Sequence, residues 1–165
     1  MRSIEVRSND FEDGGMMSDA NAARGENLSP QLSWDRIDGV GSWVIIADDP
    51  DAPNGTFVHW VLFDLPSDKT SLPSGVSGTG NKLTAGTEGK NSKGTIGYTG
   101  PNPPSGTHRY FFKVYGLDSA LDLNEGATKE QVLAEMDKYN KIAEGQIMGR
   151  YNAEGGEAAK STTTH

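Results

Sequence analysis

Residues Thr56–Leu65, TFVHWVLFDL, are apolar on both of their alternating faces and contain one histidine, His59. A strand of this kind is buried on both sides, as in the interior of a sandwich. Two other segments also predict strands, because Ser42–Ala47 is apolar and β-branched and His108–Leu117 is rich in aromatic residues. The three segments together predict a mainly β fold.

The remaining secondary structure is less strongly marked. Residues 127–140 predict the one clear helix, because Thr128 and Gln131 have capping-box spacing before an apolar stripe of Val132, Leu133 and Met136. Gly145–Tyr151 predicts a fourth strand. The 21 glycines and 8 prolines indicate many turns, and 165 residues are enough for one domain.

Composition excludes several classes of function. A net charge of −8 and a pI near 4.8 argue against nucleic-acid partners and against anionic membranes, although a local cationic pocket stays compatible. The absence of cysteine excludes disulfides and thiolate metal sites. No segment is apolar enough for a signal peptide or stable membrane insertion, so we expect a cytoplasmic protein; a secreted protein in its mature form remains an alternative.

Two regions give no clear pattern of secondary structure. Residues 69–105 form a long stretch rich in Gly, Ser, Thr and Pro, in which only the IGY sequence predicts a short strand. A loop of that length is usually functional or contains unrecognised structure. At the C-terminal end, residues 152–165 are small and polar, so we expect one domain over 1–151 followed by a frayed tail in which His165 is inert.

The two internal histidines each lie next to a loop containing proline. By the period-two rule, His59 shares a strand face with Phe57 and Val61, and His108 lies beside Tyr110 with Arg109 on the other face. Asp49 and Asp51 of the DPDAP sequence also share a face if that segment is extended, and its two X-Pro bonds are candidates for the cis form.

The loop before the third strand, GYTGPNPPSGT, loses three N–H donors to Pro101, Pro103 and Pro104, which leaves those of Gly100 and Asn102 to face an anion.

Each feature also has a simpler interpretation. A histidine beside core aromatic residues is commonly a buried residue with satisfied hydrogen bonds. The DPDAP aspartates are typical of a turn in which carboxylates accept backbone N–H groups. The proline-rich loop, taken alone, is a rigid connection. Residue spacing does not choose between these interpretations and a shared pocket.

Four segments in this order resemble the phosphatidylethanolamine-binding protein family, in particular its bacterial and archaeal Raf-kinase-inhibitor-like branch. They are GENLSPQLSW (25–34), DPDAP (49–53), HWVLFDLP (59–66) and GPNPPSGTHRYFFKVYGL (100–117), and the resemblance covers about Ser3–Tyr151. The combination is specific, although each segment alone is weak.

The resemblance implies antiparallel β-sheets in a sandwich, with one or two short peripheral helices and a small anion-binding pocket. It assigns ligand binding to residues of the two loops and the strands beside them, and structural support of the site to a second set. The ligand-binding set is Asp49, Phe57, His59, Gly100, Pro101, His108 and Tyr110; the supporting set is Pro50, Asp51, Pro53 and Arg109.

These residue types suit a phosphate group. Imidazole N–H groups, the Tyr110 hydroxyl and the Gly100 backbone N–H are donors, and a glycine allows close approach of the backbone. Asp49 has the wrong charge for an anion site. Our hypothesis is that it orients a histidine and favours its proton-donating form, or accepts a proton from the ligand.

The chain departs from the family pattern at two places. Asn102 stands where bacterial relatives commonly have cysteine, which excludes thiol chemistry there. The segment after the helix lacks the Gly-His pair of many bacterial members, so the far wall of the pocket and the size of its ligand stay open.

The favoured function is a binding protein for phosphorylated small molecules, phospholipid head groups or phosphopeptides, with no cofactor. Regulation of a partner protein such as a kinase or protease, and a homodimer, are compatible with it. One alternative is a hydrolase using His/Asp acid–base chemistry on a phosphate or acyl ester, although no nucleophile is evident. A metal site of two histidines and a carboxylate is the other, but the residues lack ligand-type spacing.

Overall fold

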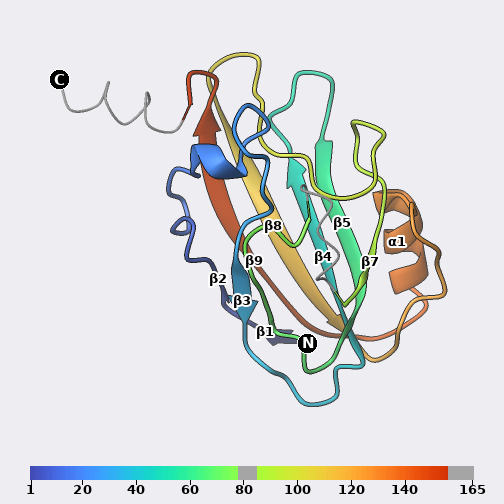
Figure 1. Cartoon of the computed structure of the whole chain (residues 1–165). Coiled ribbons are helices and arrows are strands. Elements are labelled where there is room, and N and C mark those ends of the chain that lie inside the picture. The colour runs from blue at the N-terminus through green and yellow to red at the C-terminus, as the bar shows by residue number, and fades with distance from the viewer. Residues whose placement is uncertain (78–84, 156–165) are drawn as a thin grey trace.

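Two stacked β-sheets form the protein in the computed structural model, which describes residues 1–77 and 85–155 (Figure 1). Within these residues one sheet has the order β1 (Arg2–Ser3), β9 (Lys141–Asn152), β8 (Thr107–Leu117), β4 (Ser42–Asp49), β5 (Phe57–Pro66), β7 (Thr87–Glu88). The smaller sheet has the order β2 (Val6–Arg7), β3 (Leu32–Trp34), β6 (Ser71–Leu72). Neighbouring strands are antiparallel except β1 and β9, which are parallel. The predicted mainly β, mainly antiparallel fold is confirmed.

Both faces of the large sheet are buried along β4 and β5. Alternate side chains such as Trp43 and Ile45 enter a core between the two sheets, which we call the inner side. Val44 and Ile46 enter a separate core on the outer side, together with residues of the helix α1 (Lys129–Met136). The apolar pattern on both faces therefore reflects two different cores.

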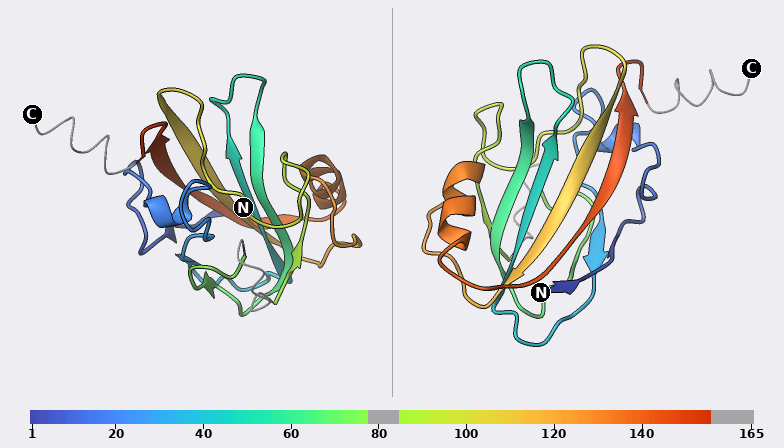
Figure 2. Two further views of the ribbon diagram at one scale, coloured as in Figure 1. Left: turned by 45° about the horizontal axis from the view of Figure 1, so that its top comes forward. Right: turned by 180° about the vertical axis from the view of Figure 1, so that it is seen from behind.

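The helix has the predicted start. The Gln131 N–H donates to Thr128 Oγ1 at 3.2 Å, and the Thr128 N–H donates to Gln131 Oε1 at 2.9 Å, which completes the capping box. Val132 and Met136 are buried, but Leu133 is 37% exposed, so its place in the predicted apolar stripe was wrong. A 3-10 turn, η1 (Asp19–Asn21), is the other helical element in the described residues (Figure 2).

Several boundaries differ from the predictions. The fourth strand is confirmed but begins at Lys141, and β6 and β7 lie within the stretch predicted as a loop. The IGY sequence forms no strand; Ile96 makes only an isolated bridge to Lys90. Asn152, assigned to the tail, still pairs with Thr107. Residues 156–165, including His165, lie outside the described residues.

A register shift in the sheet changes the direction of His59. Ala47 lies opposite Trp60, whereas the next residue, Asp48, lies opposite Val58, which leaves His59 as an extra residue on β5. Such a β-bulge redirects side chains, and bulges are frequent beside functional sites. His59 therefore does not share a face with Val61, which packs in the outer core, and the period-two prediction was wrong for that pair.

Two further findings concern the backbone and the helix. The described residues contain no cis peptide bond, so both X-Pro bonds of DPDAP are trans, contrary to the suggestion from the sequence. No described helix has the length and apolar character needed to cross a lipid bilayer.

Candidate functional site

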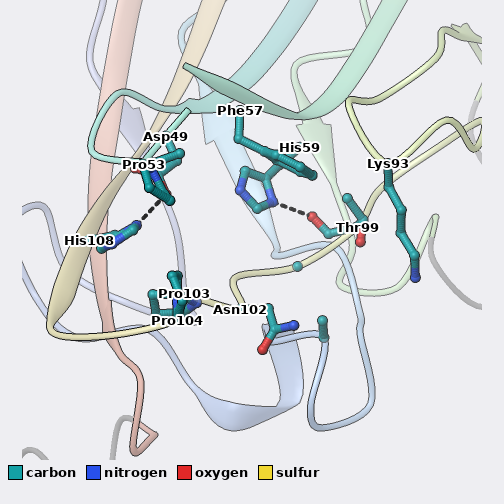
Figure 3. Close-up of a pocket in the computed structure, with 13 residues that line it drawn as sticks. Asp49, Pro53, Phe57, His59, Lys93, Thr99, Asn102, Pro103, Pro104 and His108 are labelled. Carbon is teal, nitrogen blue, oxygen red and sulfur yellow. Dashed lines mark hydrogen bonds and ion pairs between the residues drawn. The ribbon is translucent and has the colours of Figure 1, made fainter. Parts of the chain in front are cut away.

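The loops at residues 50–56 and 100–106 lie side by side at one end of the sheets, at the top of Figure 1, and the views in Figure 2 agree. Between them is a cavity of about 320 Å³. The DPDAP loop and the proline-rich loop therefore meet at one rim. The walls are formed by Ala23, Asp49, Ala52, Pro53, Phe57, His59, Lys93, Thr99, Gly100, Asn102, Pro103, Pro104 and His108 (Figure 3).

Asp49 holds His108 at one side of this cavity. Asp49 Oδ2 lies 2.6 Å from His108 Nδ1, and both side chains are buried. The other oxygen, Oδ1, accepts the Asp51 N–H at 2.7 Å. A carboxylate acceptor fixes the proton of the ring on Nδ1, which leaves His108 Nε2 for a ligand. Asp49 thus has both the turn role and the histidine-orienting role that the sequence suggested as alternatives.

His59 is fixed in the same way by a neutral acceptor. Its Nδ1 lies 2.7 Å from the carbonyl oxygen of Thr99, and a carbonyl can only accept, so Nδ1 carries the proton. Burial is the largest influence on this ring and lowers its pKa from 6.5. Neutral His59 therefore offers Nε2 to the cavity as an acceptor.

Tyr110 lies beneath both histidines and is not part of the wall. Its ring is 5.1 Å from the His59 ring in an edge-on contact and 6.5 Å from the His108 ring in a stacked one. The hydroxyl is buried and has no hydrogen-bond partner among the described residues. Burial raises the pKa of Tyr110, with a smaller contribution from Asp49, so the phenol stays protonated.

The Gly100 N–H does not face the cavity. It donates to Asn27 Oδ1 at 2.6 Å, so the predicted donor to a ligand is already engaged. A Cβ at this position would collide with the backbone at Asn21 and Ala22, which explains the glycine by packing rather than by ligand approach. Gly100 still lines the wall, whereas Pro101 does not, and the Pro101 carbonyl accepts the Ala23 N–H at 3.0 Å.

Asp51 and Arg109 connect the DPDAP turn to β8 outside the cavity. Arg109 Nε and Nη2 donate to Asp51 Oδ2 and Oδ1 at 2.9 and 2.8 Å. The Arg109 backbone N–H also donates to Asp51 Oδ2, at 2.9 Å. The side-chain hydrogen bonds lower the pKa of Asp51 to about 2. Because residues 50–55 turn, Asp49 and Asp51 point to different partners and do not share a face. The geometry agrees with the supporting role expected for this pair.

The other predicted residues divide between wall and periphery. Phe57 lines the cavity with its ring 4.8 Å from that of His59, and Pro53 lines it as well, whereas Pro50 lies in a hollow on the outer side. Sequence reasoning missed Thr99 and Lys93, which line the cavity, and Asn27, which accepts the Gly100 N–H. Asn27 has a φ of 58°, a conformation that asparagine tolerates, but neither Thr99 nor Lys93 carried a recognisable signal.

Metal coordination was the third hypothesis from the sequence. Over residues 1–77 and 85–155, no three or more His, Cys, Asp or Glu side chains come together as a group that could hold a metal ion. The Asp49–His108 pair and His59 instead direct separate nitrogen atoms toward the cavity.

A β-sandwich with a small pocket between loops at one end defines a class of small binding proteins. The sequence model of the phosphatidylethanolamine-binding protein family matches residues 7–152. The chain therefore belongs to this family, as its motifs indicated.

Relatives occur in archaea and bacteria. A protein of Methanothermobacter thermautotrophicus named UPF0098 protein is 43% identical over 149 residues, which cover 90% of this chain and 98% of the relative. Escherichia coli YbhB is 39% identical over 142 residues, covering 78% and 88%. A phosphatidylethanolamine-binding protein homolog of Chlamydia trachomatis has a similar structure, with a TM-score of 0.83, 33% identity and coverage of 92% and 99%. Escherichia coli YbcL gives a TM-score of 0.82 at 27% identity, with coverage of 90% and 98%.

Proposed function

We propose that this protein binds a small phosphorylated molecule between His59 and His108. The observation that carries the proposal is that the Nδ1 atom of each histidine already contacts a protein oxygen. Thr99 and Asp49 occupy them at 2.7 and 2.6 Å, which leaves both Nε2 atoms for one cavity. Two fixed nitrogens around one cavity suit the several oxygens of a phosphate group.

The size and lining of the cavity favour a head group over a whole lipid. A volume of about 320 Å³ is at the small end for a ligand site. Phe57, Pro53 and Pro103 give it an apolar wall beside the histidines. A phosphate ester with a small apolar group fits this combination, whereas two acyl chains require far more space.

The protonation of His59 adds a condition on the ligand. Because burial lowers its pKa, His59 is neutral near pH 7, and its Nε2 accepts a hydrogen bond rather than donating one. A ligand oxygen bound there must carry hydrogen. The monoanion of a phosphate monoester meets the condition, since its second pKa is about 6. Affinity should consequently rise as pH falls from about 8 to 6, because the phosphate monoanion becomes populated in that range.

Calorimetric titration with phenyl phosphate at pH 8 and pH 6 tests the proposal. We expect tighter binding at pH 6, and weaker binding by about 1.5–3 kcal/mol in His108→Asn, which keeps a donor for Asp49 but lacks Nε2. Phenyl sulfate, an anion without an acidic hydrogen, should bind more weakly than phenyl phosphate at pH 6. The variant must unfold at a temperature similar to wild type.

Equal affinity at both pH values together with an unaffected His108→Asn variant would show that the histidines are structural.

An acid–base enzyme is a second candidate, favoured by the short Asp49–His108 contact, which is the geometry that orients a general base. Among the described residues, no serine or threonine hydroxyl makes a hydrogen bond to either histidine. Release of phenol and inorganic phosphate in the titration samples distinguishes the candidates: stoichiometric binding without release supports the binding protein, and release in proportion to time supports the enzyme.

A further inference from the structure

We propose that Lys93 makes this pocket select ligands that carry a second acidic group and reject ligands that carry an ammonium group. The inference rests on the proposed function, because it concerns the part of the ligand that extends away from the histidines. Lys93 lines the cavity on the Thr99 side, and in Figure 3 His59 lies between it and the Asp49–His108 pair.

The loop that carries Lys93 is built around the buried side chain of Asn91. Asn91 Oδ1 accepts the backbone N–H groups of Lys93 and Thr95 at 3.0 and 3.2 Å. Its Nδ2 donates to the Gly97 carbonyl at 2.9 Å. These bonds define the backbone at Lys93, so the side chain starts from a fixed position beside the cavity.

The same loop is attached to the strand that forms the pocket wall. The Ser92 N–H donates to the Val58 carbonyl at 2.8 Å, and the Val58 N–H donates to Ser92 Oγ at 2.8 Å. Val58 is the residue between Phe57 and His59. These hydrogen bonds fix the backbone of Lys93 in space relative to the Phe57 ring and to His59.

The charges around the cavity are unequal. Lys93 is the one lysine or arginine of the wall, and it is exposed and makes no ion pair within residues 1–77 and 85–155. Asp49 is the one acidic residue of the wall, and His108 and the Asp51 N–H engage its two oxygens. A ligand ammonium therefore meets a carboxylate that already accepts two hydrogen bonds and a like charge at Lys93, whereas a ligand carboxylate meets a cation without an ion pair in the described residues.

This selectivity concerns the head group directly. When the phosphate group binds at His59 and His108, the ester substituent extends away from the two histidines. On the Thr99 side of the cavity, Lys93 is the charged residue that this substituent would meet. Ethanolamine phosphate brings a positive charge to that side. A phosphate ester of a hydroxy acid brings a negative charge there and gains an interaction that is stronger at low salt.

Three phosphate monoesters of similar size test the inference by calorimetric titration at pH 6 and low ionic strength: 2-carboxyethyl phosphate, ethyl phosphate and phosphoethanolamine. We expect affinity to decrease in that order, with about fivefold between the first and second, as for an exposed ion pair. Lys93→Met should abolish the preference and Lys93→Arg should keep it. Lys90→Met, an equal loss of charge on a neighbouring exposed residue outside the wall, should leave the order unchanged.

The outcomes separate the two proposals. Binding of ethyl phosphate with equal or weaker binding of 2-carboxyethyl phosphate would overturn the role of Lys93 alone. The role of Lys93 would also be overturned if Lys90→Met reduced the preference for 2-carboxyethyl phosphate as much as Lys93→Met does. The preference would then depend on the net charge of the protein. Absence of binding by all three esters would overturn the proposed function and this inference with it.

Discussion

Asp48 and Asp49 are consecutive buried carboxylates at the end of β4, but they lie on opposite sides of the large sheet. On the outer side, Asp48 is contacted by the ammonium groups of Lys129 at 2.7 Å and Lys113 at 3.3 Å. On the inner side, Asp49 contacts His108 and a backbone N–H. The two aspartates differ in the chemistry of their partners far more than in burial.

Each side also has a hollow. The outer one, of about 290 Å³, is comparable in volume to the pocket and is lined by Asp48 and both lysines. Its two cations contact Asp48, whereas each inner histidine contacts a protein oxygen through Nδ1. The two hollows therefore differ in the chemistry of the groups that line them and little in volume.

The comparison predicts its largest effect for Asp49→Asn. An amide has one oxygen where the carboxylate has two, so either His108 or the Asp51 N–H loses its acceptor. We expect the binding of phenyl phosphate to weaken by about 1.5–3 kcal/mol, as for a lost hydrogen bond to a charged group. Calorimetric titration between pH 5 and 8 measures it. Wild-type affinity at every pH in that range would remove Asp49 from the site.

The second prediction concerns pH and the burial of His59 on the inner side. Burial lowers the pKa of folded His59 below 6.5, so the unfolded chain takes up a proton first as pH falls. The free energy of unfolding should therefore decrease below pH 6.5, by up to about 1.4 kcal/mol at pH 5.5 for this residue.

Urea unfolding of wild type and His59→Gln, each at pH 7.5 and 5.5, measures the difference. The variant should lose less stability on acidification than wild type. Identical losses in both would mean that His59 is protonated as easily in the folded protein as in the unfolded chain.

Asp48→Asn should have the smallest effect, and on stability alone. Lys113 and Lys129 are partly exposed and can turn to solvent, so we expect a loss of about 1 kcal/mol in the free energy of unfolding. Affinity for phenyl phosphate should not change. Urea unfolding combined with titration checks both, and an affinity loss equal to that of Asp49→Asn would contradict the separation of the two sides.

Much of the fold followed from local patterns. Ser42–Ala47 and Phe57–Leu65 lie in β4 and β5, whose alternate side chains enter two different cores, and the aromatic segment His108–Leu117 lies in β8. Thr128 and Gln131 marked the helix start because a capping box needs only four consecutive residues. The strands β6 and β7 were missed because two residues contain no periodicity, and pairing across the sheet alone defines them.

The site was predicted in its residue types and only partly in its geometry. Asp49, His59 and His108 were identified from the sequence, and all three line one cavity. The Gly100 N–H was predicted to donate to a ligand but donates to Asn27. Local sequence could not show this, because Asn27 is distant in the chain. His59 and Val61 were predicted to share a strand face but do not. The β-bulge that separates them depends on the register between two strands, which the sequence of one strand does not show. Lys93 was overlooked because no local pattern relates it to β5.

The sequence by itself determined the long central strands, the helix cap, the turn chemistry of DPDAP and the loops that carry the polar residues, since these depend on interactions between near neighbours. Only the tertiary structure decided which nitrogen of each histidine is engaged and which cation borders the pocket. Those properties depend on contacts such as His59 with Thr99 and Asp49 with His108. Residues so far apart in the chain meet only when strand register and loop packing bring them together.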